Sequence, residues 1–325
     1  MCELENKTIR GYQFMEEIGQ GAFSIVYKVF SQKYNEYFVA KVIPITKEQA
    51  RSSTNLFEAE TISLMQISHP NVIKLYDFFR EDQCLILIIE FCPGGPICNR
   101  ISTKNLFSKA KLYSIAVQLL EALCACHHLG IAHRDIKTAN ILIGKYEQIK
   151  LSDFGLSSIQ DQNELNERFC GSYAYKSPEL VQNIPFDPFK ADIWALGVVF
   201  YEIATGNIPW EYRTLLELKK CICNVPIVPP DIVDPEFAEV IIMMTSHDPK
   251  KRPSAKQLAS LPIFSSENGI GVKKIVSRGS FIRSTLSMGN KSFSLKRTSK
   301  SLSTFHTKET FKEKNDLDNT GNLEK

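Results

Sequence analysis

The sequence predicts an α+β protein built from two different lobes and a tail. In the first part of the chain, short runs of β-branched, aliphatic and aromatic residues alternate with turns, as expected of strands. These runs are 12–18, 25–30, 38–43 and 85–91. From residue 108 onward the pattern is mainly helical, and after Phe264 the composition shifts to Ser, Thr, Lys and Arg. These observations divide the chain into a small sheet-rich lobe, a larger helical lobe and an extension.

The apolar periodicity places the principal helices. One helix is expected over 55–67, because residues 56, 59, 62, 64 and 67 are apolar at roughly helical spacing. Apolar positions from Leu112 to Leu123 predict a long amphipathic helix in the second lobe. Residues 193–204 are apolar nearly all round, which predicts a helix buried at the centre of that lobe.

Composition excludes some classes and leaves others open. The 325 residues carry a net charge of only +3, so overall charge argues neither for nor against nucleic acid, and no nucleic-acid partner is expected. No run approaches the roughly 18 apolar residues of a membrane span. The first seven residues lack the apolar stretch of a signal peptide. We expect a cytoplasmic protein, with the nucleus as the alternative.

The nine cysteines are an odd number, which favours reduced thiols over a disulfide framework. Cys124 and Cys126 are followed by His127 and His128, a combination that can bind metal. No second pair of ligands stands at the spacing of a zinc site, so buried thiols at a helix end are the favoured interpretation.

A glycine-rich segment lies between the first two strand-like runs. It reads Gly19-Gln20-Gly21-Ala22-Phe23-Ser24, and its glycines would let a hairpin backbone lie close over phosphates. Because the motif lacks a third glycine, by itself it is more typical of an ordinary glycine turn.

The most specific stretch is His133-Arg134-Asp135-Ile136-Lys137-Thr138-Ala139-Asn140. It is followed by a predicted strand pair, 141–143 and 148–151, and then by Asp153-Phe154-Gly155. With these motifs the chain resembles the eukaryotic protein kinase superfamily of the serine/threonine type, over residues 12 to about 264. Segments 153–157 and 170–172 are similar to the calmodulin-dependent and AMP-activated kinase branch.

The resemblance implies the two-lobed protein kinase fold. A five-stranded antiparallel sheet with one helix is expected in an N-lobe, and a larger helical C-lobe should follow. The implied boundaries are 1–11 for an N-terminal extension, 12–264 for the kinase domain, 12–91 and 92–264 for its lobes, and 265–325 for a basic, Ser/Thr-rich disordered tail.

The resemblance also implies an ATP-dependent phosphotransferase acting on protein serine or threonine, with Mg²⁺. Asp135 would orient the substrate hydroxyl and accept its proton. Lys137 would stabilise charge on the γ-phosphate, and a lysine here is typical of serine/threonine rather than tyrosine kinases. Asn140 and Asp153 would supply the hard oxygen ligands that Mg²⁺ prefers.

Lys41 is the expected ATP-neutralising cation, and such a cation needs a carboxylate to orient it. Glu58 and Glu60 both lie in the expected helix. Glu60 is preferred, because its distance from Pro70 is typical of kinases.

The expected nucleotide contacts come from the glycine segment, the strands and the connection between lobes. They are Ile18, Gly19, Gln20, Gly21, Ala22, Phe23, Ser24, Val26, Ala40, Lys41, Glu90, Cys92, Leu142 and Asp153. Val26, Ala40 and Leu142 would enclose the adenine, and the backbone at Glu90 and Cys92 would hydrogen-bond it. Ile89 would guard a rear pocket. Leu64, Leu75, His133 and Phe154 would stack across the lobes.

Structural roles are implied for three further residues. Arg252 should pair with Glu179, and Asp192 should cap the backbone of the catalytic loop. Ser172 should contact Asp135 and Lys137.

The segment 159–170 contains no Ser, Thr or Tyr, unlike the phosphorylated loop of many relatives. We therefore expect a kinase that does not need phosphorylation of this loop. Glu164 and Glu167 are either substitutes for the phosphate partner of Arg134 or solvated charges.

The tail is a candidate for autophosphorylation or a regulatory contact, since Glu202 is expected to read an arginine two residues before the target. Segments 278–280, 283–285 and 297–299 have that spacing. A disordered basic linker, or binding to calmodulin, an acidic partner or an anionic membrane surface, are alternatives. For the whole chain, the alternatives are a catalytically silent pseudokinase scaffold and a tyrosine kinase.

Overall fold

The computed structural model describes residues 4–21, 24–45, 65, 67–154 and 173–264. The chain divides into two units, Met1–Lys274 and Ile275–Lys325. Every described residue belongs to the first unit, so the expected tail lies outside them.

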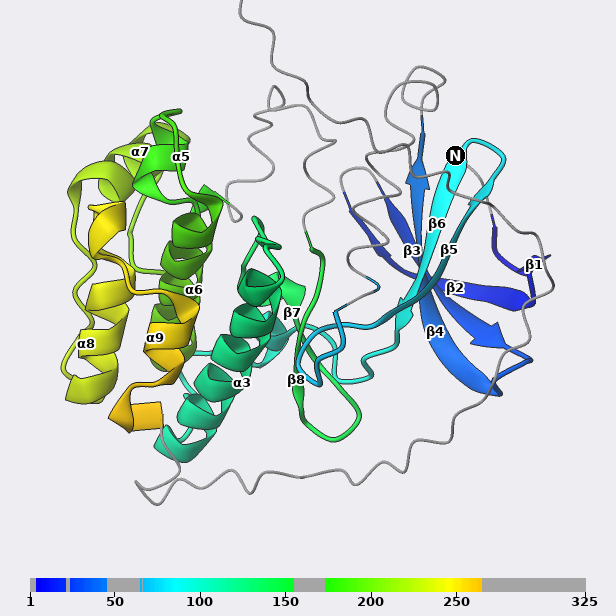
Figure 1. Cartoon of the computed structure of the whole chain (residues 1–325), viewed down its shortest axis with the longest axis horizontal. Coiled ribbons are helices and arrows are strands. Elements are labelled where there is room, and N and C mark those ends of the chain that lie inside the picture. Colours follow the sequence, from blue (N-terminus) through cyan, green and yellow to red (C-terminus); the bar gives the residue numbers. More distant parts are fainter. Residues whose placement is uncertain (1–3, 22–23, 46–64, 66, 155–172, 265–325) are drawn as a thin grey trace, which may run out of the picture. The chain divides into compact units, whose positions relative to one another are not determined.

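The first part of the chain forms an antiparallel sheet (Figure 1). Its strands are β1 (Thr8–Ile9), β2 (Tyr12–Gln20), β3 (Ile25–Ser31), β4 (Glu36–Pro44), β5 (Leu75–Glu81) and β6 (Cys84–Glu90). The order is β1-β2-β3-β4-β6-β5, so the sheet has six strands where five were expected. The additional strand, β1, pairs Thr8 with Gln13 and Ile9 with Tyr12 across a turn in which Arg10 and Gly11 have positive φ.

One face of this sheet has its own apolar core. Phe14, Tyr27 and Val29 are almost fully buried there, and the Phe14 and Tyr27 rings pack edge to face with centroids 5.7 Å apart. Burial alternates along β3, because successive strand side chains point to opposite faces. The opposite face is therefore left to form the site described below.

The predicted helix over 55–67 lies largely outside the described residues; of it, Met65 is helical and Ile67 is buried. The predicted strand pair is confirmed as β7 (Ile141–Ile143) and β8 (Ile149–Leu151).

The second part of the described chain is mainly helical. Its elements are η1 (Ile97–Arg100), α3 (Lys109–His128), η2 (Thr138–Asn140), α5 (Pro178–Val181), α6 (Pro188–Thr205), α7 (Leu215–Asn224), α8 (Pro235–Met244), η5 (Pro249–Lys251), α9 (Ala255–Ala259) and η6 (Pro262–Phe264). Helix α3 packs on α9 and α6, and α6 packs on α8 (Figure 1).

Helix α6 is the centre of the helical core, as its sequence predicted. Asp187 caps its start by accepting the backbone N–H groups of Phe189 and Lys190, and Gly206 ends it in the left-handed conformation. Trp194 and Phe200 are completely buried. Because α6 is surrounded by other elements, its buried polar residue Asp192 is held in a fixed position.

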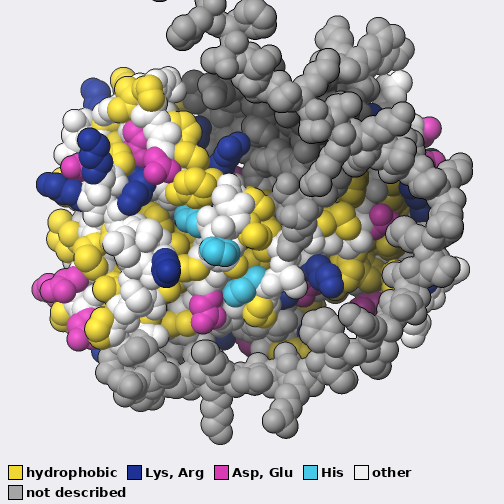
Figure 2. Space-filling view, viewed as in Figure 1, with side chains coloured by type: hydrophobic (Ala, Val, Ile, Leu, Met, Phe, Trp, Pro, Cys, Tyr) yellow, Lys and Arg dark blue, Asp and Glu magenta, His cyan; other side chains and the backbone are white. Residues whose placement is uncertain are grey.

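The surface of the helical part is mixed in charge. On the face shown in Figure 2, Lys and Arg side chains are interspersed with Asp and Glu. Among the helices that the structure describes, none combines the length and apolar character required to cross a bilayer.

Candidate active site

The loop between α3 and β7 brings three of the predicted catalytic residues together. The Lys137 ammonium donates to Asp135 Oδ2 at 2.7 Å, and Asn140 Nδ2 donates to the same oxygen at 2.9 Å. Asn140 Nδ2 also donates to the backbone carbonyl of Asp135 at 2.8 Å. One carboxylate oxygen of Asp135 is thus occupied by two donors, which leaves Oδ1 for another partner.

This loop is fixed from the core by Asp192 of helix α6, as predicted. The buried Asp192 carboxylate accepts the backbone N–H of His133 at 2.7 Å and that of Arg134 at 2.8 Å. It also contacts His127 Nε2 at 3.0 Å. Arg134 adopts a φ of 67°, which is unfavourable for a residue other than glycine. The bonds from Asp192 stabilise this conformation.

His133 links the loop to the strand that precedes Asp153. Burial lowers its pKa, so the imidazole is neutral near pH 7. Nε2–H donates to the Ser152 carbonyl at 2.8 Å, while Nδ1 accepts the backbone N–H of Asp135. The ring also packs against Phe154, with centroids 4.5 Å apart.

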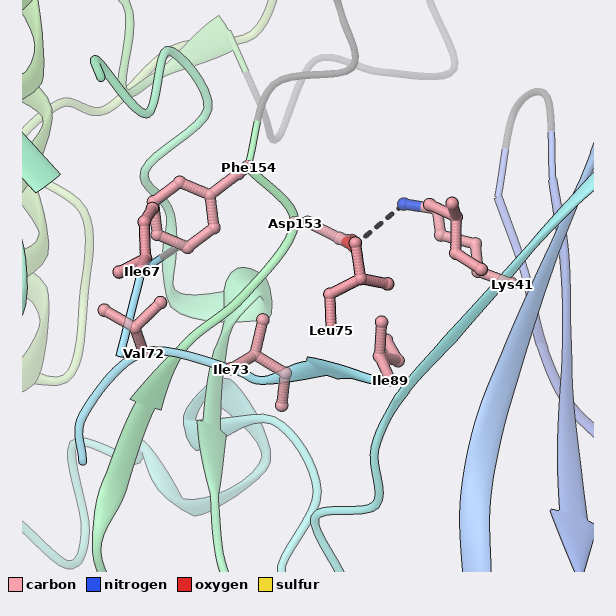
Figure 3. A pocket seen from close by; sticks show the side chains of 9 residues that line it. Lys41, Ile67, Val72, Ile73, Leu75, Ile89, Asp153 and Phe154 are labelled. Atoms are coloured by element: carbon pink, nitrogen blue, oxygen red, sulfur yellow. Dashed lines mark hydrogen bonds and ion pairs between the residues drawn. The ribbon is translucent and has the colours of Figure 1, made fainter. Parts of the chain in front are cut away.

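On the opposite side of the site, Lys41 reaches from β4 toward Asp153 (Figure 3). Its Nζ lies 2.8 Å from Asp153 Oδ1, and both side chains retain contact with solvent, at 20% and 42% exposure. The expected partner of Lys41, Glu60, lies outside the described residues, as does Glu58. The partner that the structure gives Lys41 is the predicted metal ligand.

A small apolar cavity of about 40 Å³ lies beside this pair. Its lining is Lys41, Ile67, Val72, Ile73, Leu75, Leu87, Ile89, Asp153 and Phe154 (Figure 3). The volume suits about one water rather than a nucleotide. Ile89 lies in the wall, consistent with its predicted place at a rear pocket. Leu64 lies outside the described residues.

The strand register corrects one predicted nucleotide contact. Val26 of β3 stands opposite Lys41, whereas Ala40 stands opposite Tyr27 and is fully buried in the separate core on the other face of the sheet. Because side chains alternate, the residue that shares the face of Lys41 is Val39. Val39 also pairs with Ile89, which lines the cavity. Val39 therefore replaces Ala40 as the candidate adenine contact.

The glycine segment is described except for Ala22 and Phe23. Gly19 pairs with Val26 and Gln20 with Ile25, so Ile18 to Gln20 continue β2 to its end. The Gly21 N–H donates to the Ser24 carbonyl at 2.7 Å. A Cβ on Gly21 would lie 3.0 Å from Ser24 Oγ, so a larger residue here would require a small shift of the Ser24 side chain.

The connection after β6 is tied to the strand that carries Leu142. Gly94 and Gly95 exchange backbone hydrogen bonds with Ile143, both at 2.9 Å. The buried Cys92 has no backbone hydrogen-bond partner for its N–H within the described part of the chain, which leaves this N–H open to the predicted hydrogen bond with adenine. The Cys92 thiol is not a reactive group, because burial raises its pKa to about 12.

An ion pair that the sequence did not predict joins this connection to β8. Lys150 Nζ lies 2.8 Å from the Glu90 carboxylate, and both side chains are largely shielded from solvent. Glu90 therefore has its backbone at the expected adenine site and its side chain fixed by the second lobe.

Two further contacts involve residues just before and within α5. Arg252 donates two hydrogen bonds to Glu179, at 2.6 and 2.8 Å, with both side chains buried, which confirms the predicted pair. Burial alone would raise the pKa of Glu179, but the bonds and charge of Arg252 outweigh this effect and lower it.

The second contact is a network that sequence analysis missed. Tyr175 donates to Glu202 at 2.5 Å, and Thr138 Oγ1 lies 3.0 Å from the Tyr175 hydroxyl and 3.3 Å from Glu202. Burial raises the pKa of Glu202. No lysine or arginine pairs with this carboxylate among the described residues.

The sequence matches known proteins over the same residues that form this site. A family model described as the protein kinase domain matches residues 12–264. The chain belongs to the protein kinase family. This kinase is 32% identical over 269 residues to calcium/calmodulin-dependent protein kinase type II of Caenorhabditis elegans, which covers 81% of the chain and 37% of the relative.

Other relatives are similarly distant from this kinase. It is 32% identical over 264 residues to a probable myosin light chain kinase of Dictyostelium discoideum, covering 78% of the chain and 83% of the relative. It is 34% identical over 251 residues to the serine/threonine-protein kinase Nek8 of Danio rerio, covering 76% and 36%. The kinase thus spans well under two thirds of the length of several of its relatives.

Segment 159–170, whose phosphorylation the kinase was expected not to need, lies outside the described residues, as do Gly155 and Ser172.

Proposed function

We propose that this kinase is catalytically active, transferring the γ-phosphoryl of ATP to serine or threonine hydroxyls of proteins, and is not a silent scaffold. The observation that carries the proposal is the arrangement of Asp135, Lys137 and Asn140 around one carboxylate oxygen. A scaffold has no requirement for an oriented carboxylate with one oxygen left open. The serine/threonine assignment is supported by Lys137 and by the names of the relatives.

The residues present fit a magnesium ion. Asn140 uses its amide nitrogen toward Asp135, which leaves its amide oxygen as a hard ligand. Asp153 uses Oδ1 toward Lys41, and its second oxygen is available. When bound, the ion would neutralise phosphate charge. Asn140 and Asp153 are the residues that would hold it.

The chain's own groups then perform the transfer. Asp135 Oδ1 accepts the proton of the substrate hydroxyl while the hydroxyl oxygen forms a bond to the γ-phosphorus. The bond between the γ-phosphorus and the bridging oxygen breaks, and ADP leaves. Lys137 holds the other oxygen of Asp135 and supplies positive charge beside the transferring group. Lys41 fixes the orientation of Asp153.

The test is transfer of labelled phosphate from ATP, with Mg²⁺, to a basic serine peptide by the full-length protein. Asp153→Ala should abolish labelling, and Asp231→Ala, at an exposed site, should not. Phosphoamino-acid analysis should find phosphoserine or phosphothreonine; phosphotyrosine would favour the alternative kinase class. ATP binding without transfer would support the scaffold.

We also propose that Glu202 binds a basic residue of the substrate. Its carboxylate is held by two neutral hydroxyls and has no cationic partner in the described structure. The tail segments 278–280, 283–285 and 297–299 are candidate substrates of this kind. Phosphosite mapping of the full-length protein after incubation with ATP should find them, and Glu202→Gln should reduce their labelling. An unlabelled tail would remove this part of the proposal.

A further inference from the structure

Two lysines contact the same aromatic ring, that of Tyr173. Lys176 Nζ lies 4.7 Å from the centroid of the Tyr173 ring, and Lys219 Nζ of helix α7 lies 5.4 Å from the same centroid. Neither ammonium forms an ion pair with a carboxylate in the part of the chain that the structure describes. The two cations are instead brought together by attraction to one aromatic ring.

This cluster is fixed relative to the catalytic carboxylate. The backbone N–H of Lys176 donates to the backbone carbonyl of Tyr173 at 3.1 Å, which closes a tight turn. Between them, Tyr175 contacts Thr138 of the catalytic loop at 3.0 Å. Tyr173 is buried, so the ring that the lysines share does not rotate freely into solvent. The ammonium groups of Lys176 and Lys219 therefore have a defined place near the catalytic loop.

The electrostatics of the cluster favour an incoming anion. Burial lowers the pKa of Lys176, Asp135 raises it, and the nearby Lys219 lowers it further. Two like charges that repel each other are both stabilised by one anion placed between them. Asp135 is near enough to influence Lys176, so the bound anion would lie close to the residue that is phosphorylated.

We propose that Tyr173, Lys176 and Lys219 form a subsite for an anionic side chain of the protein substrate, a carboxylate or a phosphate, located next to the target residue. The proposal rests on the proposed kinase function and gives it a substrate class. Together with Glu202, the subsite would select substrates that carry opposite charges near the target residue.

The experiment uses the full-length protein and peptides with a single serine, in which aspartate, phosphoserine, alanine or lysine is placed in turn at each of the three positions on either side. At one position, aspartate or phosphoserine should raise kcat/KM about twofold to fivefold over lysine, the range expected of exposed ion pairs. Comparing the two anions distinguishes carboxylate from phosphate recognition.

Variants assign the preference to these residues. Lys176→Met and Lys219→Met should each reduce the discrimination toward one, Lys176→Glu should invert it, and Lys176→Arg should retain it. Lys220→Met is the matched control, because Lys220 is an exposed lysine on helix α7 that contacts no aromatic ring among the described residues, and it should leave the preference unchanged.

The two proposals fail separately. Transfer to the peptides without any preference for an anion, or a preference that survives both methionine variants, would overturn the subsite. If no peptide is phosphorylated, the proposed function fails, and the subsite is then measured as binding of fluorescent aspartate and lysine peptides. Equal affinity for the two peptides would overturn it in that case as well.

Discussion

Two ion pairs in this molecule have the same charges but very different surroundings. Arg252 and Glu179 are 0% and 4% exposed and share two hydrogen bonds between the helical elements. Lys41 and Asp153 are 20% and 42% exposed and share one. A buried pair cannot exchange its partner without a large desolvation cost, whereas an accessible pair can. The first is therefore suited to stability and the second to ligand exchange.

The largest effect should come from breaking the buried pair. Arg252→Met leaves the Glu179 carboxylate buried without its cationic partner, so we expect the free energy of unfolding to fall by about 3–5 kcal/mol. Urea denaturation at neutral pH measures the loss. Adding Glu179→Gln to Arg252→Met should restore part of it. A loss below about 1 kcal/mol would show that the pair is not structural.

The accessible pair should give the opposite result. Asp153→Asn removes the charged oxygen ligand that would hold Mg²⁺, so kcat/KM should fall by about 10²- to 10³-fold. Its free energy of unfolding should change by less than about 1 kcal/mol, as for exposed ion pairs. Steady-state kinetics and urea denaturation of the same preparation test both statements. A stability loss comparable to that of Arg252→Met would contradict the comparison.

The pH dependence of stability should distinguish the buried pair further. The pKa of Glu179 is lowered in the folded state, so its contribution is present above the unfolded pKa and is lost as the pH falls through the folded value. In Arg252→Met, protonation of Glu179 removes the cost of burying its unpaired charge. The stability gap between wild type and variant should therefore narrow as the pH falls from 7 to 4. A constant gap would count against this origin.

An intermediate effect is expected for Lys150 and Glu90, which are partly shielded. Lys150→Met should lower the free energy of unfolding by about 1.5–3 kcal/mol, as for a hydrogen bond to a charged group. KM for ATP should rise, because Glu90 adjoins the expected adenine site, while kcat changes little. Unchanged KM would indicate that the pair has no influence on the nucleotide.

The smallest effect should come from the surface pair of Lys28 and Glu16, 3.4 Å apart with Glu16 62% exposed. Glu16→Gln should change the free energy of unfolding by less than about 0.5 kcal/mol. A larger loss in urea denaturation would mean that exposure does not separate these pairs.

Much of this arrangement was predictable from sequence because short motifs hold chemistry at fixed local spacing. Asp135, Lys137 and Asn140 lie within one loop, so their convergence follows from the motif. The long helices of the second lobe followed from apolar periodicity. Strand β1 did not, because two residues carry no periodic signal.

Contacts across long stretches of sequence were harder to predict. The pair formed by Lys150 and Glu90 depends on how β6 and β8 are brought together, which no local pattern records. The wrong prediction of Ala40 as an adenine contact is different, since the sequence position of Ala40 contained the information needed to avoid it. Residues of a strand alternate between faces, so Ala40, directly before Lys41, belonged to the opposite face from the outset.

Asp192 ties the reacting loop to α6, the most extensively buried of the long helices that the structure describes. Small disturbances of packing around α6 are therefore transmitted to the conformation of Arg134 before the fold is lost. Substitutions along α6 should consequently give variants whose phosphotransfer is lost on warming, at temperatures below the one at which the protein unfolds.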